Sequence, residues 1–194
     1  MPALSEGNPK TGRSVLTYSR APETTCPGAS SWCELACYAK RPFNRYQQTR
    51  EQWSRNAEND RAPLLPPPRK DGKPTLLRIH VSGDFDTAGY IRSWVGVLKE
   101  RPDVHAWAYT RSWRVPRLMK ALEELRGLSN MQLFASVDPT IDQSPPPGWR
   151  VAFIQGDDRH SGPVCMEQTG QKPSCAACGY CFRGHRGNIA FREH

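Results

Sequence analysis

The run L-L-R-I-H-V (Leu76–Val81) is the most informative stretch for the fold, because it begins a regular alternation of strand-like and helix-like segments. It is largely apolar and contains branched side chains, which is typical of a buried strand. Thr87–Glu100 then repeats apolar residues at helical spacing. The order continues with strand Val104–Tyr109, helix Val115–Leu128 and strand Gln132–Val137. Such alternation predicts a parallel sheet with right-handed crossover connections.

Further strands are expected on both sides of this region, at Val15–Ser19 and at Trp149–Ile154. The result is about five parallel strands, too few for a closed barrel of eight. We therefore expect an α/β fold, a partial (open) parallel β/α barrel. A chain of 194 residues has room for one such domain. The expected parts are a flexible arm at 1–13, the partial barrel at 14–160 with a basic helix and a Pro-rich linker at 40–75, and a Cys-rich tail at 161–194.

Polar residues follow each predicted strand. The carboxyl ends of parallel strands meet at one edge of a sheet, where such folds bind their ligands. We predict a cofactor pocket at this edge, and its candidate residues are Ser82, Gly83, Asp84, Arg111, Ser136 and Asp138. Structural alternatives stay open for some positions. Arg111 could form an ion pair with a nearby Asp, Asp86 is expected to cap the following helix, and His80 is expected in the core.

The seven cysteines fall into two groups with none between them. The front group is Cys26, Cys33 and Cys37, and the rear group is Cys165, Cys175, Cys178 and Cys181. The C-x2-C-x2-C run of the rear group is typical of a [4Fe–4S] cluster, and zinc is the alternative. Three front thiolates would leave one metal position open, as in a reactive site. A single closed site that borrows Cys165 or a histidine stays possible as another division of the ligands.

A helical turn at Trp32–Tyr38 would place Cys33 and Cys37 on one face, at positions i and i+4. The first strand thus leads into a three-cysteine loop, C-x6-C-x3-C. The second strand is followed by Ser82-Gly83-Asp84, and the fourth ends in Ser136-Val137-Asp138. This arrangement resembles the radical S-adenosylmethionine (SAM) enzymes, whose usual loop is C-x3-C-x2-C. The resemblance implies a [4Fe–4S] cluster on the front loop and SAM in the predicted pocket.

Longer motifs resemble a phage and plasmid family, the gene product 88-like proteins. The shared features are T-C-P-G followed by C-x3-C-Y-A, R-I-H-V-S-G-D-F-D, W-A-Y-T-R-S-W, and C-M-E-Q-T-G followed by C-x2-C-x2-C. They extend over most of residues 11–182. This resemblance implies the fold and the cysteine groups, and it implies no activity.

The net charge of +8 and the pI of about 9.3 are compatible with a polyanionic partner. Ten of the basic residues lie in the region 40–78, so we expect possible nucleic-acid contacts there. An electron donor is the other expected partner. The chain has no apolar run of about 18 residues and begins without the pattern of a signal peptide, so we expect a cytoplasmic protein that does not span a membrane.

These observations predict an iron–sulfur protein with one or two [4Fe–4S] clusters, radical-SAM-like, that binds or cleaves SAM and could act on nucleic acid. Whether it is an enzyme is left open. The alternative is a nucleic-acid-binding protein stabilised by zinc or by a cluster, without catalysis.

Overall fold

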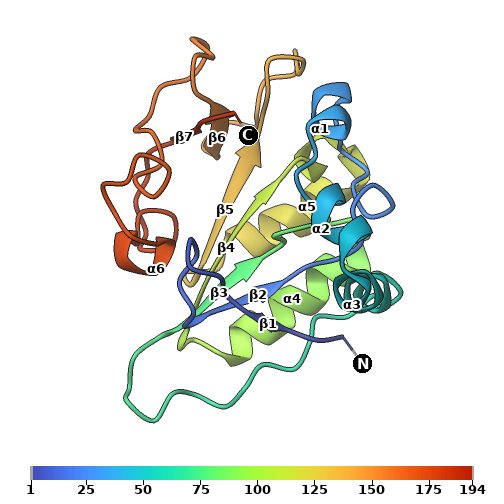
Figure 1. The fold of residues 1–194 in the computed structure, drawn as a ribbon, viewed down its shortest axis with the longest axis vertical. Coiled ribbons are helices and arrows are strands. Elements are labelled where there is room, and N and C mark those ends of the chain that lie inside the picture. The colour runs from blue at the N-terminus through green and yellow to red at the C-terminus, as the bar shows by residue number, and fades with distance from the viewer. Residues whose placement is uncertain (1, 194) are drawn as a thin grey trace.

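The computed structural model describes residues 2–193, which build a seven-stranded sheet in the order β1-β2-β3-β4-β5-β6-β7 (Figure 1). The strands are β1 (Ser5–Glu6), β2 (Val15–Tyr18), β3 (Thr75–Ile79), β4 (Val104–Thr110), β5 (Met131–Ser136), β6 (Arg150–Ile154) and β7 (Ile189–Phe191). β1 is antiparallel to β2, and every later neighbour is parallel. Within the described residues β1 and β7 are the edge strands and do not pair with each other, so the sheet is open; beyond β6, β7 makes one isolated parallel bridge, between Ala190 and Val164.

Helices α4 (Ala88–Glu100) and α5 (Pro116–Arg126) cover one face of the sheet (Figure 1). Thr87 caps α4 through its side-chain oxygen, which accepts a hydrogen bond from the Tyr90 amide, and Pro116 occupies the first turn of α5. The two helices bury apolar side chains on the faces that meet the sheet: Tyr90, Ile91, Trp94, Val95, Leu98, Leu118, Ala121, Leu122 and Leu125. Burying these side chains against the sheet forms the main core.

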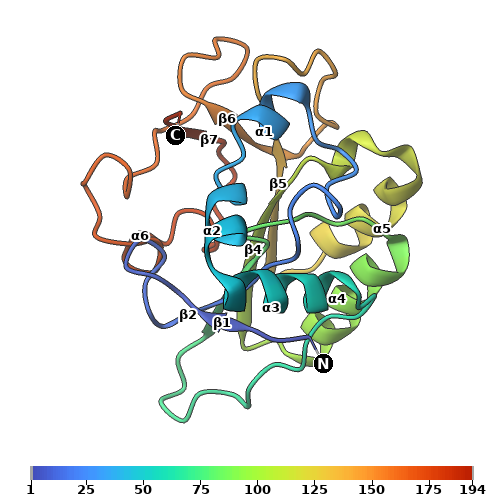
Figure 2. The same ribbon diagram turned by 45° about the vertical axis from the view of Figure 1, so that its right-hand side comes forward.

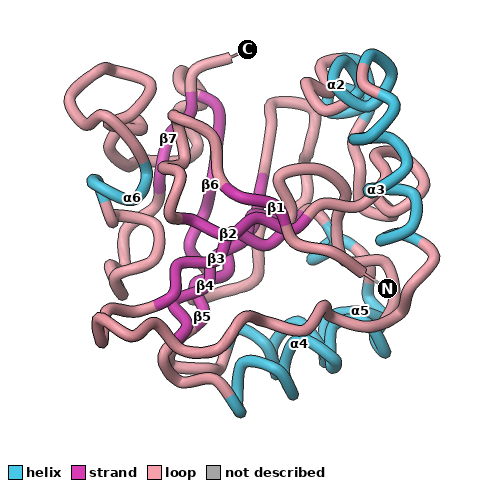
Figure 3. The backbone as a smooth tube through the Cα atoms, turned by 60° about the horizontal axis from the view of Figure 1, so that its bottom comes forward, coloured by secondary structure: helices cyan, strands magenta, loops and turns pink. Residues whose placement is uncertain are grey.

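The opposite face of the sheet carries the C-terminal segment (Figure 3). Side chains alternate along β4, so Ala106 and Ala108 join the core under the helices, while Trp107 and Tyr109 pack on the other face. The Phe182 ring packs against the Trp107 ring in a tilted arrangement, with the ring centroids 5.0 Å apart. The C-terminal segment is therefore part of the same packed domain as the sheet.

The remaining helices are short and lie in the connections: α1 (Ser31–Leu35), α2 (Lys40–Arg45), α3 (Gln47–Ala57), α6 (Cys175–Cys178) and the 3-10 turn η1 (Ser112–Arg114). In Figure 2, α1 and α2 are drawn between α6 on one side and α4 and α5 on the other. α3 is fixed by Asn56, whose buried side chain donates hydrogen bonds to the carbonyls of Ser19 and Ala3.

The expected α/β class with a mostly parallel, open sheet is confirmed, and each predicted strand is present within two residues of its bounds. Three details differ. The parallel part has six strands instead of about five, because β7 was not predicted. The basic helix expected within residues 40–75 is divided into α2 and α3 at Tyr46. Residues 2–13, which lie in the expected flexible arm 1–13, supply β1 and two carbonyls that accept hydrogen bonds from Cys175 and Ala176.

No helix within residues 2–193 is both long enough and apolar enough to cross a bilayer.

Candidate functional site

A cavity of about 560 Å³ lies at the carboxyl ends of the parallel strands, against the sheet face that carries Trp107 and Tyr109. All seven cysteines line it: Cys26, Cys33, Cys37, Cys165, Cys175, Cys178 and Cys181. Five of the six predicted cofactor residues line it as well, namely Ser82, Gly83, Asp84, Arg111 and Ser136. The fold thus brings the two distant cysteine groups and the predicted rim to one place, as expected for a parallel sheet.

The front cysteines lie on a loop and a short helix that are tied to the strand ends. Ser30 caps α1, since its hydroxyl oxygen accepts a hydrogen bond from the Cys33 amide at 3.1 Å. The same hydroxyl donates to the Asp138 carboxylate at 2.5 Å. α1 ends at Leu35, so Cys37 lies beyond the helix. The prediction of one helical turn that presents Cys33 and Cys37 on the same face is therefore wrong.

The rear cysteines surround the single turn of α6. Cys175 and Cys178 begin and end this helix, which Ser174 caps at one end and Gly179, in the left-handed conformation, at the other. Cys181 follows the turn, and buried Cys165 is held by a backbone hydrogen bond to Ala190 of β7.

Burial controls the protonation of several of these thiols. It raises the pKa of Cys26 to about 12, with the nearby charge of Asp84 adding to the effect. Burial also raises the pKa of Cys175 to about 11 and that of Cys181 to about 12. At neutral pH these three side chains are therefore neutral thiols in this arrangement.

Asp84 connects the ends of β3 and β4. Its carboxylate accepts hydrogen bonds from the Thr110 hydroxyl at 2.6 Å and from the amides of Phe85 and Arg111 at 2.7 and 2.8 Å. Burial raises the pKa of this carboxyl, while the three donors act in the opposite direction. Three protein donors therefore already occupy the Asp84 carboxylate, a predicted residue of the cofactor pocket.

Arg111 and Asp138 form an ion pair at 3.1 Å, which is the structural alternative that the sequence left open for Arg111. Burial alone would raise the pKa of Asp138, but hydrogen bonds from Ser30 and Thr140, together with the Arg111 charge, hold it below its ordinary value. Asp138 is fully buried and does not line the cavity. It fixes the front loop to the end of β5.

His80 and Asp86 have structural partners. His80 is buried, as expected, and shares a hydrogen bond of 2.8 Å between its Nε2 atom and the Tyr90 hydroxyl. Asp86 forms an ion pair with Arg20, and the helix cap predicted for Asp86 is supplied by Thr87.

Arg78 is a residue of the cavity that the sequence prediction overlooked. It lies in the middle of β3, and its guanidinium faces the ring of Tyr109 at 5.4 Å. Its Nε atom is buried and has no hydrogen-bond partner among the described residues. The available signal was a single cation within the apolar run L-L-R-I.

The arrangement of the described side chains gives the predicted iron–sulfur function no support. Among residues 2–193, no three or more His, Cys, Asp or Glu side chains form a group that could hold a metal ion. The predicted function as a radical-SAM-like iron–sulfur protein is therefore wrong, and the same finding removes the alternative of a zinc- or cluster-stabilised nucleic-acid-binding protein.

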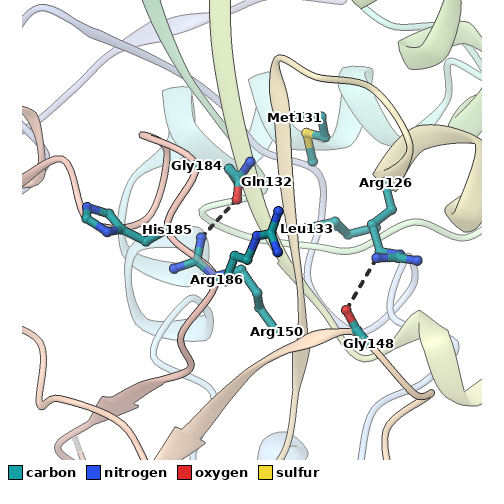
Figure 4. Close-up of a pocket in the computed structure, with 9 residues that line it drawn as sticks. All are labelled: Arg126, Met131, Gln132, Leu133, Gly148, Arg150, Gly184, His185 and Arg186. Atoms are coloured by element: carbon teal, nitrogen blue, oxygen red, sulfur yellow. Dashed lines mark hydrogen bonds between the residues drawn. The ribbon is translucent and has the colours of Figure 1, made fainter.

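A second hollow, of about 410 Å³, lies near the amino ends of β5 and β6 (Figure 4). Its walls are basic, with Arg126, Arg150, His185 and Arg186. Two of these arginines already have partners. Arg150 donates to Gln132 Oε1 at 3.0 Å, and Arg126 donates to the Gly148 carbonyl and pairs with Glu123. We therefore place the candidate site in the cysteine-lined cavity.

The basic region 40–78 does not form one surface. The arginines at positions 41, 45, 50 and 55 are exposed on α2 and α3. Arg69 pairs with Asp71 in the linker, and Arg78 lines the cavity. Nucleic acid and an electron donor as partners stay predictions.

Fold and site together define a class: an open, mostly parallel α/β protein in which two cysteine groups line one cavity at the carboxyl edge of the sheet. The chain belongs to the Gene product 88 family, whose family model matches residues 2–184. This membership confirms the resemblance to the gene product 88-like proteins. The resemblance to radical SAM enzymes stays a prediction.

Two phage proteins are among the relatives. The chain is 29% identical to the Gene 88 protein of Mycobacterium phage L5 over 203 residues, which cover 86% of this chain and 81% of that protein. It is 27% identical to the Gene 88 protein of Mycobacterium phage D29 over 199 residues, which cover 84% and 80%. No solved structure matches the chain.

Proposed function

We propose that this protein binds a small molecule in the cysteine-lined cavity at the carboxyl edge of the sheet. The observation that carries the proposal is convergence: all seven cysteines and the ends of β3, β4 and β5 contribute to one cavity of about 560 Å³. This volume lies within the range of roughly 300–1,000 Å³ typical of ligand sites. Ligand sites in open parallel sheets also lie at this edge.

The walls of the cavity suit a ligand with both apolar and polar parts. Tyr109, Phe182 and Phe191 supply aromatic surface, and the loops after the strands supply polar groups. Asp84 and the Arg111–Asp138 pair hold these loops in place, because their hydrogen bonds join segments that are far apart in the chain. Preformed walls reduce the entropy lost on binding.

Native mass spectrometry of the full chain, purified without oxygen, tests this proposal. We expect a retained small-molecule mass on the wild-type protein. Ser136→Phe places an aromatic ring at the end of β5, where it would fill part of the cavity, and should remove that mass. The control Ser129→Phe changes an exposed residue outside the cavity and should retain it. A protein without any retained mass, or equal retention in both variants, would contradict the proposal.

The same spectra test the cofactor predictions, because [4Fe–4S] clusters, zinc and SAM differ in mass. These cofactors stay predictions that the retained mass decides.

A further inference from the structure

Arg78 is a cation in a place where the protein itself offers it no anion. β3 is otherwise apolar around it, with Leu76, Leu77 and Ile79. No carboxylate of residues 2–193 forms an ion pair with Arg78, and its buried Nε has no acceptor among them. The guanidinium faces the Tyr109 ring at 5.4 Å. Arg78 is half-buried, and a cation whose buried Nε has no acceptor is costly, so its presence requires an explanation.

The carboxylates that line the cavity do not supply that partner. Asp84 accepts its hydrogen bonds from Thr110, Phe85 and Arg111. Glu167 lines the cavity but lies beyond ion-pair distance of Arg78. A second cation, Lys10, stands on the cavity wall without an ion pair among the described residues.

Other arginines with buried guanidinium atoms have acceptors within the protein. Arg20 pairs with Asp86 and donates to the carbonyls of Asn56 and Ala57. Arg150 donates to Gly187, Gln132 and Tyr180. Arg114 also has a buried Nε without an acceptor, but its Nη1 donates to the carbonyls of Gly28 and Ala29. Arg78 differs from these arginines because its buried Nε has no acceptor and it forms no ion pair among residues 2–193.

We infer that Arg78 binds an anionic group, a carboxylate or a phosphate, of the ligand that occupies this cavity. This inference rests on the proposed function and names the chemical class of the ligand. A guanidinium presents several donors in one plane and can bind either anion through two parallel hydrogen bonds. Lys10 would add a second positive charge at the cavity wall.

Thermal unfolding of the full chain in phosphate or in acetate, at constant ionic strength with chloride as the reference, tests the inference. We expect one of the two anions to raise the Tm of the wild-type protein, which also tells a phosphate ligand from a carboxylate ligand. Arg78→Met should weaken anion binding by about tenfold or more. Without the anion, Arg78→Met should be at least as stable as the wild type, because an unpaired, half-buried charge has been removed.

Arg126→Met is the matched control. It removes one positive charge from the second hollow, outside the cysteine-lined cavity, and should leave the anion response unchanged. Protection of the cavity cysteines from alkylation by the anion gives a second readout on the wild-type protein that requires no variant.

Three results would overturn the inference. They are an absent anion response in the wild type, an equal response in wild type and Arg78→Met, or a loss of stability in Arg78→Met that shows a purely structural cation. A ligand retained in native mass spectrometry together with any of these results would refute the role of Arg78 and leave the binding cavity standing.

Discussion

At the scale of single residues, the polar groups at the strand ends divide into those that build the site and those that remain free for a ligand. Asp84, Asp138 and Arg111 form hydrogen bonds and an ion pair within the protein. The buried Nε of Arg78 has no such partner among the described residues. A sequence pattern can place a residue at a strand end, but it cannot show which partners arrive from distant segments. For this reason the sequence predicted which residues lie at the strand ends, but it did not predict that Asp84 and Asp138 bind other parts of the protein.

His80 gives a prediction about pH. Burial, with the Arg20 charge as a smaller cause, lowers the pKa of His80 well below 6.5 in the folded protein. The unfolded chain therefore takes up a proton on this side chain near pH 6.5, while the folded protein does not. The stability is fully present above about pH 6.5 and is lost as the pH falls below it, by up to about 1.4 kcal/mol per pH unit.

His80→Asn should reduce this acid-side loss, since asparagine does not titrate and tolerates the positive φ of 62° at this position. Urea unfolding at several values between pH 5 and 8 measures the effect. His105→Asn, at a partly exposed position on β4, serves as the control. An unchanged pH profile in His80→Asn would show that another group causes the loss.

At the scale of elements, the pattern of apolar residues predicted the long helices and the central strands, because each buries a regular face. The short elements form for reasons other than a regular apolar face. β7 has three residues within a polar segment, and it forms only because β6 offers a free edge. α1 buries no side chain and depends on its cap. Neither has a periodic signal that a sequence could reveal.

Ser30→Ala tests how α1 is held. The change removes the hydroxyl that caps α1 by accepting a hydrogen bond from the Cys33 amide, and it also removes the hydrogen bond to Asp138. We therefore expect a loss of about 1–2 kcal/mol in the free energy of unfolding. We also expect faster alkylation of Cys33, measured by mass spectrometry of the labelled peptides. Ser31→Ala, at the exposed neighbouring position, should change neither quantity. Equal labelling of Cys33 in the two variants would mean that Ser30 does not hold this helix.

At the scale of the whole molecule, the chain folds so that its two cysteine groups close one cavity from two sides. The front loop follows β2, and the rear segment returns across the opposite face of the sheet from α4 and α5 (Figures 1 and 3). The sequence predicted both groups and the sheet edge. It left open how the seven cysteines divide, because the return path of the C-terminal segment depends on contacts such as Trp107 with Phe182.

The measurement that tests the shared cavity most directly is cross-linking of the native chain with a short bis-maleimide, followed by peptide mass spectrometry. We predict intramolecular links that join a front cysteine, Cys26, Cys33 or Cys37, to a rear cysteine. This preference should disappear in urea. Links confined to each group in the native protein would contradict a cavity that both groups line.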